Sequence, residues 1–348
     1  AGMTPPTLVN MITVTGNDAT VRDLHLEGYI AGGVAVSRGI AVDSGASPVD
    51  GLTIDNVLAS IQQYGFGILN DESATDVTIT NSKFAASGNG LAVEHRGSLV
   101  GLTMTGGEIS GNVYGFGVNA QNTVGYDNAG TCTGISITGT TVSGNSQKGL
   151  YFEKLSNSSF TNMTFTGNAG AAMTAPQFPP AALEFNLKFD DFSTITVTGC
   201  TFSDNGGNRP LDGAAMVIAA RNDGATYSAN PATLANVTVS GGSITGSPAN
   251  IKISNDVDLE TVTISGTELN GLGAGIVVAG VDAGEVLTLG NVRFNSTLTY
   301  SVFQAKAGAT VNAAAALFAS SETYVAGSAL PLADAFAAAD KVVDSVDA

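Results

Sequence analysis

Apolar and polar residues alternate in short runs along the chain, and one of these runs recurs. A segment such as Leu52-Thr53-Ile54, or a close variant of it, appears nine times. The copies begin at Leu52, Val77, Leu102, Ile135, Ser158, Ile195, Val237, Val262 and Leu287. The steps between them are 25, 25, 33, 23, 37, 42, 25 and 25 residues. A period of this length predicts a protein built from stacked repeats.

Each repeat is predicted to consist of strands, because Val, Ile, Thr and Phe alternate with period two and no amphipathic helical run interrupts them. A second strand follows at a fixed offset, as in Gly65-Phe66-Gly67-Ile68 and Gly90-Leu91-Ala92-Val93. Between the two lies a short third strand such as Ser82-Lys83-Phe84, closed by a corner such as Ser87-Gly88-Asn89. Three short strands with corners that tolerate left-handed backbone predict one coil of a right-handed parallel β-helix.

The fold class is therefore all-β, a single-stranded right-handed parallel β-helix of about eleven coils spaced about 4.8 Å apart. We expect one domain over residues 1–348, with a lead-in at 1–11, coils over 12–310 and a C-terminal cap at 311–348. A short helix is predicted near 331–344, because Pro331 suits a first turn and Leu332, Phe336, Ala339 and Val343 share one face. It would cover the last coil.

These repeats resemble the pectate-lyase-like superfamily of right-handed parallel β-helices over about residues 12–310. More narrowly, stretches 149–157 and 183–191 resemble secreted bacterial β-helix repeat proteins. The superfamily includes polysaccharide lyases, uronan epimerases, phage tailspikes, adhesins and surface-layer elements, so the resemblance implies the fold and leaves the activity open. Tyr64-Gly65-Phe66 and Tyr114-Gly115-Phe116 resemble part of a uronan epimerase motif, but the acid and histidine that complete it are missing.

The charge narrows the range of partners. Lys and Arg number 13 against 30 Asp and Glu, and the net charge is −17. Such acidity excludes nucleic acid and anionic membrane as partners, and no stretch reaches the roughly 18 apolar residues of a membrane span. Only 12% of residues are charged. A surface of this kind favours assembly, so the expected partners are a polysaccharide or other copies of the chain, in a homo-oligomer or a larger array.

The cysteines and the start of the chain bear on its location. Two cysteines, no tryptophan and a start at Ala1 without a basic-then-apolar leader indicate a mature or excised chain outside the cell or at the cell surface. Cys132 and Cys200 fall two coils apart, too far for a disulfide, so we expect free, mostly buried thiols.

Insertions in neighbouring repeats indicate where a ligand would bind. The long steps place loops at 119–131, 170–181, 205–213 and 222–233, and insertions in adjacent repeats commonly form one binding face. In register, Arg96, Lys154, Lys188 and Arg221 would lie along one edge near these loops. Arg and Lys pair with uronate carboxylates, so this edge predicts a groove for an acidic polysaccharide.

Two interpretations of this edge stay open. For cleavage by β-elimination, Lys154, Lys188 or His95 could be the base, Arg96 or Arg221 the stabiliser and Tyr151 the proton donor. Carboxylates that could pair with them are Glu153, Glu184, Asp190 and Asp223. Alternatively, these residues are solvated charge ladders, with Glu153 and Glu184 matched to Lys154 and Lys188, which add little to stability.

Asp-rich corners are candidate calcium sites, because Ca²⁺ prefers hard oxygen ligands. The candidates are Asp71, Asp190, Asp191, Asp256 and Asp258. None belongs to a complete loop motif, and Asp at corners also serves as a turn former. No other cofactor is expected.

The sequence favours a non-enzymatic, extracellular structural or adhesive element of a surface or matrix, one that assembles or binds glycan. The first alternative is a polysaccharide lyase or epimerase acting on an acidic, uronate-containing glycan. The second is a phage receptor-binding fibre. Low charge and the lack of a recognisable catalytic set favour the non-enzymatic interpretation.

Overall fold

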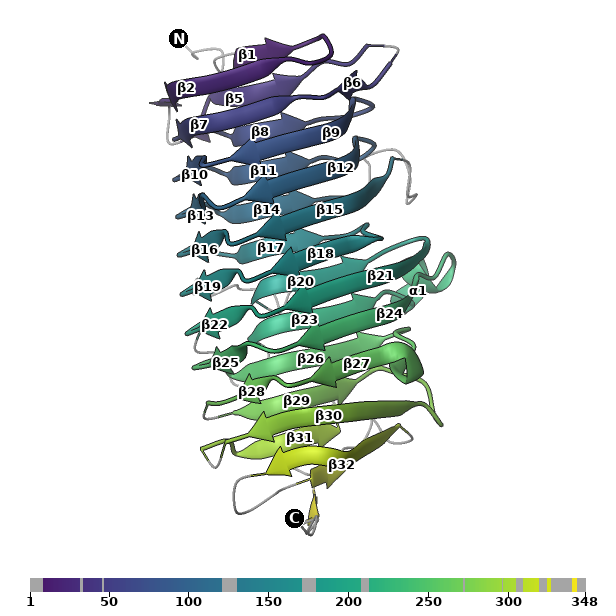
Figure 1. The fold of residues 1–348 in the computed structure, drawn as a ribbon. Helices are drawn as coiled ribbons and strands as arrows, with labels where there is room; N and C mark the ends of the chain where they lie inside the picture. Colours follow the sequence, from purple (N-terminus) through teal and green to yellow (C-terminus); the bar gives the residue numbers. More distant parts are fainter. Residues whose placement is uncertain are drawn as a thin grey trace, which may run out of the picture.

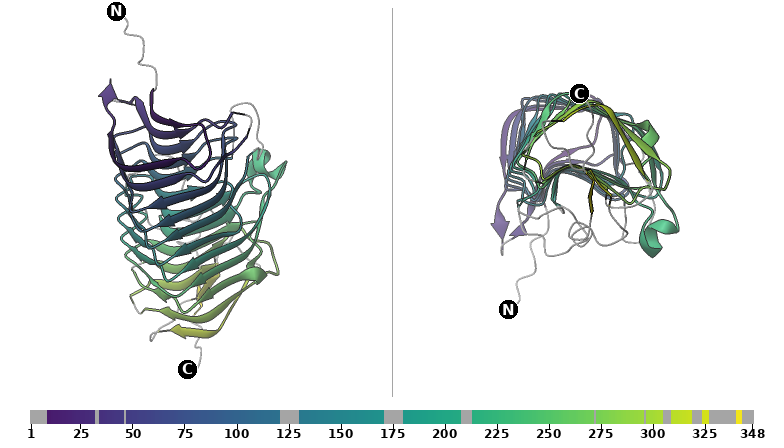
Figure 2. Two further views of the ribbon diagram at one scale, coloured as in Figure 1. Left: turned by 45° about the horizontal axis from the view of Figure 1, so that its top comes forward. Right: turned by 90° about the horizontal axis from the view of Figure 1, so that it is seen from below.

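The computed structural model is a rod of stacked coils with the two chain ends at opposite ends (Figure 1). It describes residues 9–31, 34–45, 47–120, 130–170, 180–207, 213–271, 273–295, 297–304, 309–318, 324–326 and 340–342. Seen along its axis, the rod has one sheet on one side and a second sheet that bends around the other (Figure 2). The parallel β-helix expected from the repeats is confirmed.

The strands of the described residues form two large sheets, parallel except for the β33–β34 pair, and one small hairpin. Sheet A contains β1 (Val9–Val14), β5 (Ser37–Val42), β8 (Tyr64–Ile68), β11 (Asn89–Val93), β14 (Tyr114–Val118), β17 (Lys148–Phe152), β20 (Ala181–Leu187), β23 (Ala214–Ala220), β26 (Ala249–Asn255), β29 (Ala274–Ala279), β31 (Tyr300–Gln304), β33 (Tyr324–Ala326) and β34 (Asp340–Val342). The hairpin joins β3 (Ile30–Ala31) to β4 (Val34–Ala35).

Sheet B holds the recurring signature and the short third strands. Its longer members are β2 (Thr20–Glu27), β7 (Thr53–Ser60), β9 (Ser73–Thr80), β12 (Ser98–Thr105), β15 (Cys132–Thr138), β18 (Ser158–Thr161), β21 (Asp191–Thr198), β24 (Thr233–Ser240), β27 (Val262–Ser265), β30 (Val286–Phe294) and β32 (Thr310–Phe318). The short members are β6 (Val49–Asp50), β10 (Lys83–Ala85), β13 (Glu108–Ser110), β16 (Thr141–Ser143), β19 (Thr164–Thr166), β22 (Thr201–Ser203), β25 (Ser243–Thr245) and β28 (Glu268–Leu269).

The nine signature copies stack in the register that the sequence predicts. Their central residues pair in the order Thr53, Thr78, Thr103, Ser136, Ser159, Thr196, Thr238, Thr263 and Thr288. The long steps therefore add residues between strands and leave the pairing unchanged. A slip by one residue would turn every apolar side chain of a strand from the core to the outside, which explains why the register is kept.

Each coil turns at corners where one residue adopts a left-handed backbone. The corner between long and short strands uses Asp23, Asn56, Asn81, Gly106, Gly139, Asn162, Gly199, Gly241, Gly266 and Asn291. A second column, within the long strands or just before them, consists of Asp18, Gly51, Asp76, Gly101, Gly134, Asn157, Thr194 and Asn236. Gly, Asn and Asp tolerate positive φ better than other residues, so the predicted corner chemistry is confirmed. Thr194, at φ 64, is a β-branched exception.

The core is a stack of apolar side chains inside the coils. Leu91, Phe116, Leu150, Leu183, Met216, Ile251 and Ile276 follow one another in register on sheet A, and all are buried. The rings of Phe165 and Phe202 lie parallel on adjacent coils, with centroids 4.5 Å apart. Burial of this continuous column supplies the main driving force for folding.

A ladder of buried asparagines closes the corner before sheet A. The side-chain Nδ2 of Asn112 donates to Oδ1 of Asn145 at 2.9 Å, and Asn145 donates to Asn168 at 2.8 Å. Asn168 donates to Asn205 at 3.0 Å. Each Nδ2 also donates to a backbone carbonyl of the short-strand layer. The ladder thus satisfies polar groups that would otherwise be buried without partners.

The ends of the predicted domain need correction. Strand β1 begins at Val9, inside the expected lead-in, because its backbone pairs with β5. At the other end β32 and β33 pair in parallel with β30 and β31, so the coils continue beyond residue 310. The predicted helix at 331–344 lies mostly outside the described residues. Its residues 340–342 form strand β34 instead, which pairs antiparallel with β33 and covers backbone groups at that edge.

Helices contribute little to the described part of the chain. The α-helix α1 (Gly224–Ser228) projects from the side of the rod, and the 3-10 helix η1 (Leu259–Thr261) precedes β27. Within these residues no helix has the length and apolar character required to cross a membrane.

Replacing a rung of the asparagine ladder should destabilise the rod. We expect Asn145→Ala to lower the free energy of unfolding by about 3 kcal/mol, because neighbouring buried groups lose their partners. Urea denaturation followed by circular dichroism measures the change. Thr103→Ala, at an exposed site on β12, is the control and should change stability by less than about 0.5 kcal/mol. An Asn145→Ala protein as stable as this control would contradict the role of the ladder.

Replacing the strained threonine should have the opposite effect. Asn157 and Asn236 occupy the same column as Thr194 on the adjacent coils, both with positive φ. We expect Thr194→Asn to raise the free energy of unfolding by about 1 kcal/mol, because asparagine tolerates this backbone region. Thr196→Asn, in the extended part of β21, is the matched control and should lower stability slightly. Urea denaturation followed by circular dichroism measures both changes. Equal effects of Thr194→Asn and Thr196→Asn would disprove backbone strain at Thr194.

Candidate functional site

The outer face of sheet A carries an unusual set of residues on β17 and β20. Leu150 and Phe152 belong to the core, so Tyr151 between them lies on the opposite face. Glu184 pairs with Tyr151 in register, and Lys148 pairs with Ala181. Parallel pairing therefore brings polar side chains from two successive coils together on the outside of the sheet.

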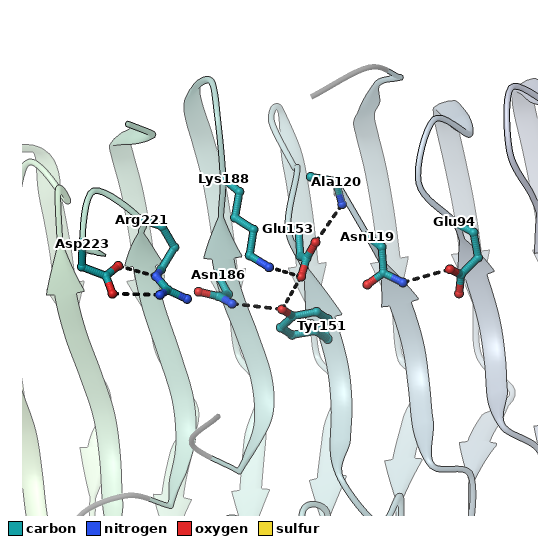
Figure 3. A network of polar contacts seen from close by, with 9 residues as sticks. All are labelled: Glu94, Asn119, Ala120, Tyr151, Glu153, Asn186, Lys188, Arg221 and Asp223. Carbon is teal, nitrogen blue, oxygen red and sulfur yellow. Dashed lines mark hydrogen bonds and ion pairs between the residues drawn. The ribbon is translucent and has the colours of Figure 1, made fainter. Parts of the chain in front are cut away.

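We call this group the polar cluster. It consists of Lys148, Tyr151, Glu153, Glu184, Asn186 and Lys188, and all six residues are buried. Figure 3 shows that several of these side chains point toward one another across adjacent coils.

Ion pairs and hydrogen bonds hold the polar cluster together. The ammonium group of Lys148 pairs with Glu184, and that of Lys188 pairs with Glu153. The Tyr151 hydroxyl donates to Oε1 of Glu153 at 2.6 Å and accepts from Nδ2 of Asn186 at 2.9 Å. Oε2 of Glu153 accepts from the backbone N–H of Ala120 at 2.9 Å. Glu153 is thus the central acceptor (Figure 3).

The electrostatics of the polar cluster keep its tyrosine protonated. Burial raises the pKa of Tyr151 well above its ordinary value, and the negative charges of Glu153 and Glu184 raise it further. Burial and the same two carboxylates also raise the pKa of Tyr114, whose ring centroid lies 6.0 Å from that of Tyr151. Both phenols therefore remain hydrogen-bond donors at neutral pH.

Arg221 and its partners continue the polar contacts from the polar cluster toward the surface. Its guanidinium makes two hydrogen bonds to the carboxylate of Asp223, one of them at 2.8 Å, and lies 4.1 Å from the ring centroid of Tyr227 on α1. Burial alone would raise the pKa of Asp223, but the hydrogen bonds and charge of Arg221 outweigh it and lower the pKa. The Lys188 ammonium lies 5.6 Å from the same tyrosine ring, which connects Arg221 to the polar cluster.

The basic residues that the sequence places along one edge are bonded to groups of the chain itself, and two of them, Lys154 and Lys188, are buried. Lys154 is buried and donates to the carbonyl oxygens of His95 and Gly97, both at 2.8 Å. Arg96 is half exposed and bonds to Asp71 at 2.6 Å. The alternative of solvated charge ladders is wrong for Lys154 and Lys188, because both are buried.

Sequence reasoning missed two members of the polar cluster. It matched Glu184 to Lys188 or Lys154, whereas its partner is Lys148. The available signal was the position just before Gly149, which the repeat places opposite Tyr114. Asn186 follows Glu184 by two residues and so shares its face of the strand. Alternation along β20 would have revealed it.

The candidate calcium ligands make ordinary contacts. Asp190 accepts from the N–H of Asp191, Asp191 from Thr233, and Asp258 from the N–H of Glu260. Burial, with the charges of Asp282 and Asp191, raises the pKa of Asp256. In the part of the chain that the structure describes, no group of three or more His, Cys, Asp or Glu side chains could hold a metal ion.

The cysteines are free and buried, as predicted. Burial raises the pKa of the Cys132 thiol to about 12, although the charge of Lys154 acts in the opposite direction. Burial also raises the pKa of Cys200. Neither side chain has the thiolate character of a catalytic nucleophile.

A shallow hollow of about 380 Å³ lies on sheet B, away from the polar cluster. Its polar lining side chains already bond to neighbours: Asn56 donates to Asp23 at 2.9 Å, and Lys83 pairs with Glu108 at 2.9 Å. The polar cluster on sheet A is therefore the better candidate site.

Comparison with known proteins identifies the family. The model of the right-handed β-helix region matches residues 10–176 and 67–312, which together span most of the chain. The chain belongs to the right-handed β-helix family. This confirms the resemblance to the pectate-lyase-like superfamily. No curated protein sequence matches the chain.

Several solved β-helix structures are similar to this β-helix protein. The catalytic unit of a thermostable GH87 alpha-1,3-glucanase from Streptomyces thermodiastaticus strain HF3-3 is 14% identical, with a TM-score of 0.52 over 88% of this chain and 61% of that one. An alginate lyase from Paenibacillus sp. str. FPU-7 is 11% identical, with a TM-score of 0.38 over 78% of this chain and 93% of that one.

 The tailspike protein gp49 from Pseudomonas phage LKA1 is 15% identical, with a TM-score of 0.41 over 92% of this chain and 53% of that one.

The similarity to these solved structures concerns the fold alone. The β-helix protein spans about three-fifths of the glucanase catalytic unit, since 61% of that chain is covered. Identities of 11% to 15% do not carry residue roles from one chain to another.

The ion pair between Lys148 and Glu184 should be dispensable for the fold of the β-helix protein. We expect Lys148→Met to lower the free energy of unfolding by about 3 kcal/mol, because Glu184 stays buried without its cation. The double variant Lys148→Met/Glu184→Leu should return to within about 1 kcal/mol of the wild type. Urea denaturation of the single and double variants measures both values. A double variant less stable than Lys148→Met would show that the pair is needed for folding.

Proposed function

We propose that the protein binds a polysaccharide on the outer face of sheet A, beside the polar cluster. The observation that carries the proposal is the burial of two ion pairs, one of which, Lys148 with Glu184, occupies positions where the fold does not need charge. The coils next to them place Gly117 and Val217 in the column of Tyr151 and Glu184, and Ala181 and Ala214 in the column of Lys148.

Buried ion pairs are a poor means of stabilising a fold. Taking two charges out of water costs several kcal/mol for each ion, and their attraction offsets this only partly. In the columns of Lys148 and Glu184, the buried residues Ala181, Ala214 and Val217 show that apolar side chains suit the same positions on adjacent coils. A costly arrangement of carboxylates, ammonium groups, a phenol and an amide therefore favours a function in recognition or catalysis.

The cations in and near the polar cluster do not favour a uronan as the ligand. Lys148, Lys188 and Arg221 each pair with a carboxylate of the chain itself. A uronate would have to compete with these internal partners, because Arg and Lys recognise carboxylates by the same contacts. The interpretation as a lyase or epimerase of acidic glycans is thus weaker than the sequence alone suggests.

Cleavage of a glycosidic bond is a second candidate, favoured by one observation. Glu153 and Glu184 come from adjacent coils, and both raise the pKa of Tyr151 between them. A pair of carboxyl groups on either side of the scissile bond is the common arrangement for glycoside hydrolysis. The glucanase among the fold relatives supports this only as an analogy of fold.

The structural or adhesive role expected from the sequence receives less support. Glycan-active enzymes and a tailspike share the fold, and the polar cluster gives a glycan-directed role a specific site. An extracellular location and an oligomeric state both fit this proposal. Both are proposed for this protein. The phage receptor-binding fibre is a further alternative.

Affinity electrophoresis through gels that contain one polysaccharide each tests the proposal. The panel contains α-1,3-glucan, β-1,4-glucan and xylan as neutral chains, and alginate and pectate as acidic chains. We expect retardation of the wild type by at least one of them, and about tenfold weaker binding by Asn186→Ala, which loses a hydrogen bond to Tyr151. Glu108→Gln, on the remote surface pair with Lys83, is the control and should bind as the wild type does.

Release of reducing ends and absorbance of unsaturated products, measured on the same panel, separates cleavage from binding. Hydrolysis raises reducing ends alone, and β-elimination raises both signals. Failure to bind any glycan, or equal binding by Asn186→Ala and Glu108→Gln, would refute the proposed site.

A further inference from the structure

Two tyrosines stand beside the polar cluster on the same outer face of sheet A. Residues Arg38, Tyr64, Asn89, Tyr114 and Lys148 follow one another in register on β5, β8, β11, β14 and β17. Tyr64 and Tyr114 are half-buried, so part of each side chain is exposed. They are two coils apart, about 10 Å along the rod.

The residues next to these tyrosines fix their side of the sheet. Phe66 and Ile68 lie in the core, so Gly67 between them faces outward. A Cβ atom at Gly67 would lie 3.5 Å from Cβ of Tyr64, and one at Gly117 would lie 3.9 Å from Cβ of Tyr114. Both tyrosines therefore project outward beside positions that carry no side chain.

Polar groups that suit sugar hydroxyls surround the two rings. Glu94 hydrogen-bonds to Tyr64 and accepts from Nδ2 of Asn119 at 3.0 Å. Burial, with the charge of Glu94, raises the pKa of Tyr64 to about 12, so its hydroxyl remains a donor. An apolar ring with a carboxylate and an amide at its edge can contact both the C–H face and the hydroxyls of a sugar.

The charges near the rings are balanced. Arg38 lies over the Tyr64 ring, 5.9 Å from its centroid, and the negative charge of Glu94 acts on the same tyrosine in the opposite direction. Tyr114 continues this row to the polar cluster through its contact with Tyr151. A ligand that follows the row meets aromatic surface and hydrogen-bonding groups without a net positive field, which would be needed to attract a polyanion.

We infer that the ligand is a neutral glycan that lies along the rod axis, with sugar rings on Tyr64 and Tyr114 and its next unit beside the polar cluster. This inference rests on the proposed function and adds the chemical class and the direction of the chain. It differs from the acidic glycan that the sequence suggests.

Titration of the full chain with hexasaccharides tests the inference. The probes are α-1,3-glucan, β-1,4-glucan and xylan hexasaccharides, with hexagalacturonate as the acidic probe. Because the chain has no tryptophan, tyrosine fluorescence reports binding directly, and calorimetry gives the affinity. We expect Tyr64→Leu and Tyr114→Leu each to weaken binding of a neutral probe about fivefold, since the aromatic face is lost while apolar bulk is kept.

Two matched variants make the test specific. Tyr114→Phe keeps the ring and should bind within about twofold of the wild type if stacking dominates. Tyr29→Leu changes a tyrosine that is 59% exposed but lies outside this row, and it should have no effect. Thermal unfolding of each variant confirms that it is folded before titration.

The possible results test the inference and the proposed function separately. If Asn186→Ala weakens binding while both leucine variants bind as the wild type does, the tyrosine row is wrong and the polar cluster stands. Tighter binding of hexagalacturonate than of every neutral probe would overturn the neutral class. Binding of no saccharide at all would overturn the proposed function, and the inference with it.

Discussion

Parallel backbone pairing between successive coils is the constraint on which this structure depends. Every coil must return the chain to the same place one strand spacing further along, and left-handed corner residues make this return possible. Insertions of different length enter between strands, yet the threonine column from Thr53 to Thr288 stays in register. The pairing therefore fixes both the core and the position of every outward side chain.

The same pairing creates the candidate site. Lys148 and Glu184 are 36 positions apart in the chain, and Glu153 and Lys188 are 35 apart, but each pair meets on adjacent coils. On the outer face of sheet A, one column runs from Gly67, Ala92 and Gly117 to Tyr151 and Glu184 and then returns to an apolar residue at Val217. A change of chemistry along an otherwise regular column identifies the polar cluster more clearly than any single residue does.

The sequence was sufficient for the fold because hydrophobic alternation and corner residues act locally. The repeat predicted the register of the strands, the corners and the buried cysteines. It could not predict the burial of Lys154 and Lys188, because alternation shows which face a residue occupies but not whether that face is covered. It also placed a helix over 340–342, where pairing with β33 outweighs the local helical pattern.

The asparagine ladder connects only the coils from Asn112 to Asn205. The resistance of the coils to opening should therefore differ along the rod. Buried oxygens without a hydrogen-bond partner in the described residues occur beyond both ends, at Ser37 and Gln62 on one side and at Ser247, Asn250 and Asn270 on the other. In a stack where each coil contacts only its neighbours, opening proceeds inward from the weaker ends. Coils held by Asn112 to Asn205 would exchange their amide protons last. The strands of the polar cluster, β17 and β20, belong to these coils. The cluster would therefore keep a rigid support while the ends of the rod open.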